Sequence, residues 1–111
     1  MEMESMIGDD LQDYLVEFLA TVNITLMELE SAVGEADVQV LSRGLRRIRE
    51  QAQMFGANTL RDLAEQSQSL VAANAIADVA EYLLYMRKEY SAVREQLSQH
   101  FDVNRERERY G

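Results

Sequence analysis

Apolar residues recur every three or four positions along most of this chain, and this spacing constrains the fold more than any other feature. Side chains three and four positions apart share one face of an α-helix, so the spacing predicts amphipathic helices. Proline, which would break a helix, is absent from the 111 residues, and there are only five glycines. We therefore expect helix nearly throughout.

Four segments carry this spacing, and polar residues or glycine mark their ends. The first segment covers residues 9 to 33 and opens with two aspartates, which suit the positive end of a helix dipole. The second lies between Asp37, its expected N-cap, and Gly56, its expected C-cap. We expect turns at residues 34 to 37 and 72 to 74. The third segment is expected to be capped by Asn58 or Thr59, and the fourth starts at Ile76.

Each segment has one apolar stripe, and these stripes predict the core. The expected core residues are, in the first segment, Leu11, Tyr14, Leu15, Phe18, Leu19, Val22, Leu26, Leu29 and Val33; in the second, Leu41, Leu45, Ile48, Ala52 and Phe55; in the third, Leu60, Leu63, Ala64, Ser67, Leu70 and Val71; and in the fourth, Ile76, Val79, Ala80, Leu83, Leu84, Met86, Tyr90, Val93, Leu97 and Phe101.

Short connections between amphipathic helices favour antiparallel neighbours, because each helix can bury its stripe only against the others. The sequence thus predicts an all-α fold, an antiparallel up-down-up-down four-helix bundle over residues 9–101. Residues 1–8 are expected to form an N-terminal extension. Residues 102–111 alternate in charge without an apolar period and are expected to form a polar tail, a frayed helix end or a linker.

Charge and composition narrow the function. The net charge of −9 argues against binding to nucleic acid or to an anionic membrane. There is no cysteine for a disulfide or a thiolate metal site, no apolar run long enough to span a membrane, and no basic leader. We expect a cytoplasmic protein without a cofactor.

The sequence offers no pattern for catalysis. The single histidine, His100, has no partner at metal-ligand spacing and is expected to be exposed in the last turn of a helix, and Glu28 is expected to be an ordinary surface carboxylate. No serine belongs to a recognisable nucleophile motif. Of the tyrosines in the fourth segment, Tyr85 falls off the stripe and hints at a partner surface. No catalytic residue, metal site or enzymatic activity is expected.

Positive charge is concentrated in the second segment. Four arginines lie within seven positions of a chain that has no Lys or Arg before Arg43. With the stripe turned inward, the 100° helical step places six residues on the outer face: Arg43, Arg46, Arg47, Glu50, Gln53 and Met54. An ordinary solvated face is one interpretation of such a pattern.

A second interpretation comes from resemblance to a known family. The stretch LRRIREQAQMFGANTLRDLAEQSQSL resembles the signature of the histidine phosphotransfer (HPt) domains of bacterial phosphorelays, with Phe55-Gly56-Ala57 and Leu60 at the family's Leu-Gly-Ala and Leu. Ile48 stands at the apolar position and Arg49 at the lysine. The resemblance covers about residues 9 to 99. It implies a four-helix bundle with a phosphoacceptor histidine exposed on the second helix.

Two residues depart from that signature. Arg46 stands at the phosphoacceptor position, and Glu50 stands at the glycine that lets a response regulator's loops approach. A guanidinium stays protonated and has no free lone pair for attack on phosphorus, so Arg46 cannot replace imidazole as a phosphoryl carrier. Glu50 adds bulk and a negative charge facing a regulator's acidic cluster. The chain looks like a degenerate, pseudo-phosphotransfer domain.

Two functions remain open. The first is a docking module that binds a receiver or histidine kinase domain without carrying phosphate. The residues expected to contact that partner are Arg43, Arg46, Arg47, Arg49, Glu50 and Met54. The alternative is a structural interaction or dimerisation bundle within a larger protein, with partners outside phosphorelay signalling. Homo-oligomerisation is compatible with both.

Overall fold

The protein folds into four helices. The computed structural model describes the backbone of residues 2–110 and the side chains of residues 12–98. The helices are α1 (Glu2–Glu35), α2 (Val38–Met54), α3 (Asn58–Ala72) and α4 (Ile76–Tyr110), and no strand occurs within residues 2–110. The predicted all-α class is confirmed.

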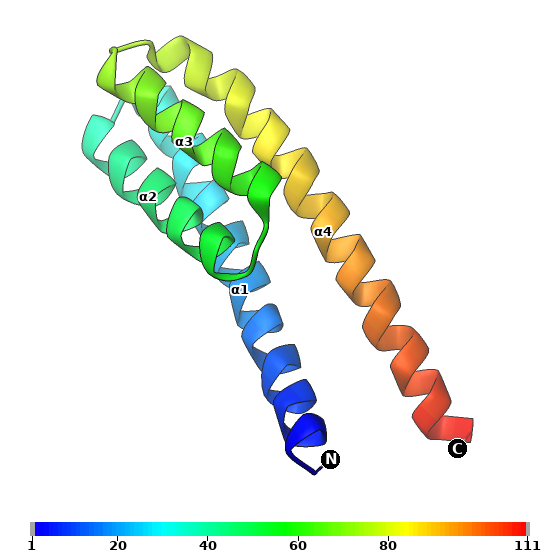
Figure 1. The fold of residues 1–111 in the computed structure, drawn as a ribbon. Coiled ribbons are helices and arrows are strands. Elements are labelled where there is room, and N and C mark those ends of the chain that lie inside the picture. Colours follow the sequence, from blue (N-terminus) through cyan, green and yellow to red (C-terminus); the bar gives the residue numbers. More distant parts are fainter. Residues whose placement is uncertain (1, 111) are drawn as a thin grey trace.

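Each helix packs against its neighbours in the chain, and α4 closes the bundle by packing against α1 (Figure 1). Diagonal helices do not pack together among the described residues. This is the predicted antiparallel up-down-up-down bundle. Both chain ends lie at the same end of the molecule, where α1 and α4 extend past α2 and α3 (Figure 1).

One continuous core fills the bundle. The predicted stripe of α2 is buried at Leu41, Leu45, Ile48 and Ala52, and that of α3 at Leu60, Ala64, Ser67 and Val71. The other buried residues are Phe18, Val22, Thr25, Leu26, Leu29 and Ala32 of α1, Gly44 of α2, and Val79, Leu83, Met86 and Tyr90 of α4. Thr25 and Ser67 satisfy their hydroxyls by donating to the carbonyls of Thr21 and Leu63, one helical turn earlier.

Three core predictions are wrong, because Tyr14, Ala80 and Leu84 are exposed. Each of the three adjoins another predicted core residue, and neighbouring helical residues point about 100° apart, so only one of each pair faces the core. Seven further predicted residues are half-buried and pack against the core: Leu19, Val33, Phe55, Leu63, Leu70, Ile76 and Val93. The predicted core residues Leu11 and Phe101 lie outside the described side chains.

The three connections between helices are short because the same turn motif ends each of the helices α1, α2 and α3. A residue with positive φ follows the end of each helix: Ala36 at 54°, Gly56 at 70° and Asn74 at 60°. After α1, Ala36 N–H donates to Val33 O at 3.2 Å, and Asp37 N–H donates to Ala32 O at 3.0 Å. These are the paired bonds of a Schellman motif.

The expected caps are partly confirmed. Asp37 is the N-cap of α2, where its side chain accepts from Val40 N–H at 3.2 Å, and Gly56 follows α2 as predicted. The prediction of Asn58 or Thr59 as the N-cap of α3 is wrong. Ala57 holds that position without a side-chain bond, because the tight turn at Gly56 lets the helix start immediately.

The outer helices are longer than expected. α1 begins seven residues before Asp9 and continues through Gly34, since nothing in residues 2–8 or at Gly34 interrupts it, and α4 runs nine residues past Phe101 to Tyr110. The division into residues 1–8, 9–101 and 102–111 stays a prediction. Over the described part of the chain, no helix is long and apolar enough to cross a membrane.

Candidate functional site

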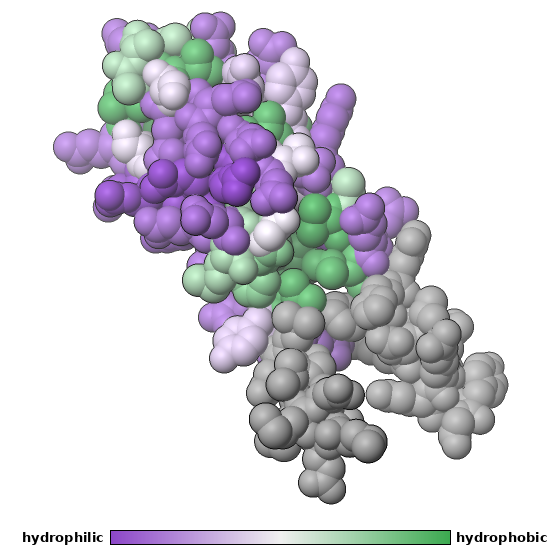
Figure 2. All heavy atoms as spheres, viewed as in Figure 1, coloured by the Kyte–Doolittle hydropathy of each residue, from purple (hydrophilic) through white to green (hydrophobic). Residues whose placement is uncertain are grey.

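The outer face of α2 displays most of the predicted site residues. Arg43, Arg46, Arg47, Glu50 and Met54 are all exposed, because the stripe from Leu41 to Ala52 faces the core. We call these five residues the α2 face. Figure 2 shows hydrophilic residues over the side of the molecule where α2 lies, with hydrophobic residues gathered below it, toward the end that carries both termini.

Arg46 and Glu50 form a loose pair on this face. Arg46 Nε lies 3.8 Å from Glu50 Oε1, one helical turn away, and both side chains are mostly exposed. Exposed pairs at this spacing contribute only about 0.3 to 0.5 kcal/mol. The Arg46 guanidinium can therefore exchange Glu50 for the carboxylate of a partner at little cost.

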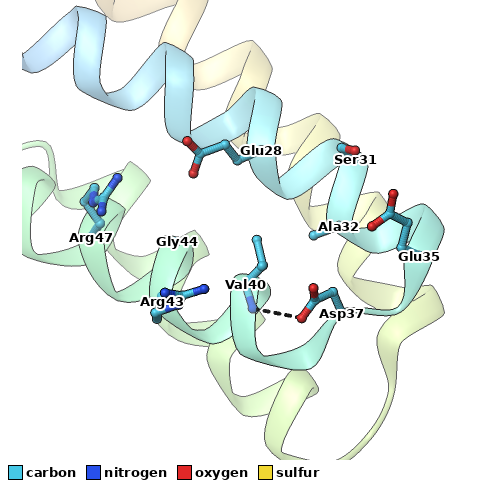
Figure 3. Close-up of a pocket in the computed structure, with 9 residues that line it drawn as sticks. All are labelled: Glu28, Ser31, Ala32, Glu35, Asp37, Val40, Arg43, Gly44 and Arg47. Carbon is cyan, nitrogen blue, oxygen red and sulfur yellow. Dashed lines mark hydrogen bonds between the residues drawn. The ribbon is translucent and has the colours of Figure 1, made fainter.

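A groove of about 450 Å³ runs between α1 and α2 beside this face (Figure 3). Arg43 and Arg47 line it from α2, and Glu28 and Glu35 line it from α1. Gly44 forms part of its wall and leaves no side chain in it. Because both signs of charge are present, the groove suits a polar partner surface better than a simple anion.

A small pocket of about 140 Å³ with both apolar and polar lining, the polar part from Glu17, Thr21 and Gln51, lies at the other end of the α2 face. Met54 is 71% exposed and Tyr14 is 59% exposed, and both line it. The Phe18 and Phe55 rings, which also line it, pack with their centroids 4.8 Å apart. The site thus combines exposed arginines with Met54 and Tyr14, and arginine, methionine and tyrosine are residue types enriched at protein-protein interfaces.

Sequence reasoning missed the contribution of α1 to this site. Glu28 was expected to be an ordinary surface carboxylate and Tyr14 a core residue. Their proximity to α2 depends on the register of the two helices, which is visible where Gly44 packs on Leu29 and Phe55 on Phe18. Glu28 and Tyr14 could have been identified from the sequence only with an estimate of how α1 and α2 are aligned against each other.

Arg49 differs from the other arginines of α2. It is half-buried, and its Nε is buried without a hydrogen-bond partner among the described residues. Leu45 and Ala52, about one helical turn before and after it, are both fully buried, so Arg49 lies close to the core side of α2. Arg49 therefore lies at the edge of the exposed patch rather than on the α2 face.

The remaining polar candidates form no second site. Among the described residues, no group of three His, Asp or Glu is placed to hold a metal ion. His100 lies ten residues before the end of α4, so it is not in the last turn as expected, and its side chain is outside those described. Tyr90 is buried beside the Arg87 guanidinium, while Tyr85 is exposed and donates to Glu81.

Comparison with protein-family models identifies the family. The model described as Hpt domain matches residues 13–96, which includes all of α2 and α3 and most of α1 and α4. The chain belongs to the Hpt domain family. Searches of curated proteins and of solved structures found no match. Membership places this Hpt chain among phosphorelay-related modules and agrees with the bundle described above.

Proposed function

We propose that this Hpt chain is a non-catalytic docking module, which binds a receiver or histidine kinase domain through the α2 face and carries no phosphoryl group. The observation that carries the proposal is Arg46, which is exposed on α2 and which the resemblance described under the sequence analysis aligns with the phosphoacceptor histidine of the HPt signature. A permanently charged guanidinium cannot accept a phosphoryl group as imidazole does.

The distribution of charge supports a docking role for this face. Residues 2–35 carry nine acidic and no basic residues, while the other eleven acidic residues of the chain balance its eleven Lys and Arg. The arginines of α2 are therefore a local positive patch on an acidic protein. A receiver domain that offers an acidic pocket would be attracted to this patch and repelled by α1 beside it.

Arg46 suits such an acidic pocket. It is flanked by Arg43 and Arg47 on the same exposed face, and its present contact with Glu50 is long and solvated. Guanidinium binds carboxylates through two parallel hydrogen bonds, which are stronger than neutral ones. Met54 and Tyr14 would add apolar contact at the rim. In this arrangement the chain occupies the receiver without reacting with it.

Calorimetric titration at low salt tests the docking role. We expect receivers or kinases from the same organism to include at least one that binds, and Arg46→Ala to weaken that binding about tenfold or more, as for a buried charge-assisted contact. Arg61→Ala removes the same charge from α3 and serves as the control. If no receiver or kinase binds the wild type, the proposal is wrong and the alternative of a structural bundle is favoured.

A further inference from the structure

The three arginines of the α2 face have almost no ionic partners within the protein. Among residues 12–98, Arg43 and Arg47 form no ion pair, although two glutamates of α1 line the groove beside them (Figure 3). Arg46 has only its long and solvated contact with Glu50. The guanidinium donors of this face are therefore available to a partner.

The same three arginines lie within about one turn of α2. Arg43 precedes Arg46 by three positions and Arg47 by four, and side chains at these spacings are neighbours on a helix surface. Like charges so close repel each other, and α2 as a whole carries four arginines against one glutamate. That glutamate, Glu50, follows Arg46 and does not lie between it and Arg43. An anion that contacts Arg43 and Arg46 together would relieve the repulsion.

The carboxylates of α1 limit which anions this face can hold. Glu28 and Glu35 line the groove opposite the arginines, so a free anion that enters the groove meets both signs of charge. Arg46, in contrast, does not line the groove. The position between Arg43 and Arg46 is therefore open from the outer face, to a group that a docked partner brings there.

A phosphoryl group fits two guanidiniums better than a carboxylate does. A carboxylate has one negative charge and two oxygens, and one guanidinium can satisfy it with two parallel hydrogen bonds. A phosphoryl group carries nearly two charges on three terminal oxygens, so it can accept from two guanidiniums at once. The acidic pocket of a receiver offers only carboxylates before phosphorylation and a phosphoryl group after it.

Because two neighbouring arginines are exposed on this face with no strong partner of their own, we infer that it prefers the phosphorylated form of a receiver. In this complex Arg43 and Arg46 both donate to the phosphoryl oxygens. The inference rests on the proposed docking role and adds the state of the partner to it. The phosphoryl group stays on the receiver, because neither guanidinium can accept it.

Calorimetric titration of a receiver with and without beryllium trifluoride tests the preference. This complex binds the acceptor carboxylate and presents fluorine acceptors in place of the phosphoryl oxygens. We expect the wild type to bind the loaded receiver about tenfold more tightly, as for one additional charge-assisted contact. Equal affinities for the two forms, or binding of a kinase and of no receiver, would overturn the inference and leave the docking role intact. No binding of any partner would overturn both.

Two variants separate this contact from a general effect of charge. Arg43→Ala is expected to abolish the preference, while the unloaded receiver still binds because Arg46 keeps its carboxylate contact. The control is Lys88→Ala, which removes the same charge from an exposed residue of α4. Within the described part of the chain, α4 does not pack against α2, so this variant should keep the full preference. An equal loss of preference in the two variants would contradict a contact made by Arg43.

Inorganic phosphate alone distinguishes a free anion from one that a partner carries. We expect no saturable heat when phosphate is titrated into the wild type, because the carboxylates of α1 lie beside the arginines and no receiver surface adds its own contacts. Saturable binding of phosphate, lost in Arg43→Ala, would identify a site for the free ion and overturn the inference that the group arrives on a docked receiver.

Discussion

Gly44 of α2 packs directly on Leu29 of α1. A Cβ at position 44 would lie 2.6 Å from Leu29 Cδ2, closer than such atoms approach, and 3.4 Å from Thr25 Cγ2. A Cβ at position 44 would therefore force the buried Leu29 side chain to shift or the two helices to move apart. The contact fixes the register that brings Glu28 opposite the arginines of α2 (Figure 3).

Gly44→Ala is expected to destabilise the protein. Alanine gains about 1 kcal/mol of helix propensity over glycine, but overpacking a core costs about 1 to 3 kcal/mol, and Leu29 is fully buried. We expect a net loss of about 1 kcal/mol in the free energy of unfolding, measured by urea denaturation. Gly34→Ala is the matched control, because no atom lies within 4 Å of its Cβ. It should stabilise the protein, and a loss there equal to that at Gly44 would refute the packing explanation.

In the turns after α1 and α2, replacing alanine by glycine and replacing glycine by alanine are expected to change the stability in opposite directions. Ala36 and Gly56 both follow a helix with positive φ, a conformation that costs a residue with a Cβ about 1 kcal/mol. Ala36→Gly should therefore raise the melting temperature, and Gly56→Ala should lower it, each by about 4 °C. Both changes are measured by thermal unfolding. A shift of the same sign in both variants would argue against these turns.

Tyr85 has a perturbed titration. Its hydroxyl donates to Glu81 Oε1 at 2.6 Å, and this bond, together with the charge of the carboxylate, raises the pKa of Tyr85 above its usual value. Glu81→Gln removes the charge, so the pKa should fall toward that of a free tyrosine. Phenolate absorbance followed against pH measures the change, with Tyr85→Phe identifying the transition. Identical curves for wild type and Glu81→Gln would show that the bond does not persist in solution.

The sequence predicts the short inner helices better than the long outer ones. In α2 no two predicted core residues are adjacent, so its stripe leaves one assignment, and in α3 both members of each adjacent pair are buried or pack against the core. In α1 and α4, adjacent apolar residues such as Tyr14 with Leu15 and Leu83 with Leu84 allow two alternative core assignments, and periodicity cannot choose between them. The start of α3 was also mispredicted, because no side chain caps it at Ala57.

The candidate site was predicted only in part, because two helices form it and the apolar pattern describes one helix at a time. The outward arginines follow from the stripe of α2, because the residues of one helix determine its own faces. The groove and the pocket beside Met54 also need α1, and nothing local to α2 indicates that Tyr14 or Glu28 lies beside it. The burial of Arg49 could not be predicted either, because at the edge of the exposed face it depends on the neighbouring helix.

Phosphoryl transfer from a partner kinase supplied with labelled ATP tests the proposed docking role and the proposed absence of phosphoryl transfer together. The wild type is compared with Arg46→His and with the double variant Arg46→His, Glu50→Gly, which restores both departures from the family signature. We predict no acid-labile label on the wild type and clear label on the double variant, because the partner still docks on the α2 face and only the acceptor is missing. Acid-labile label on the wild-type chain would contradict a docking module that carries no phosphate.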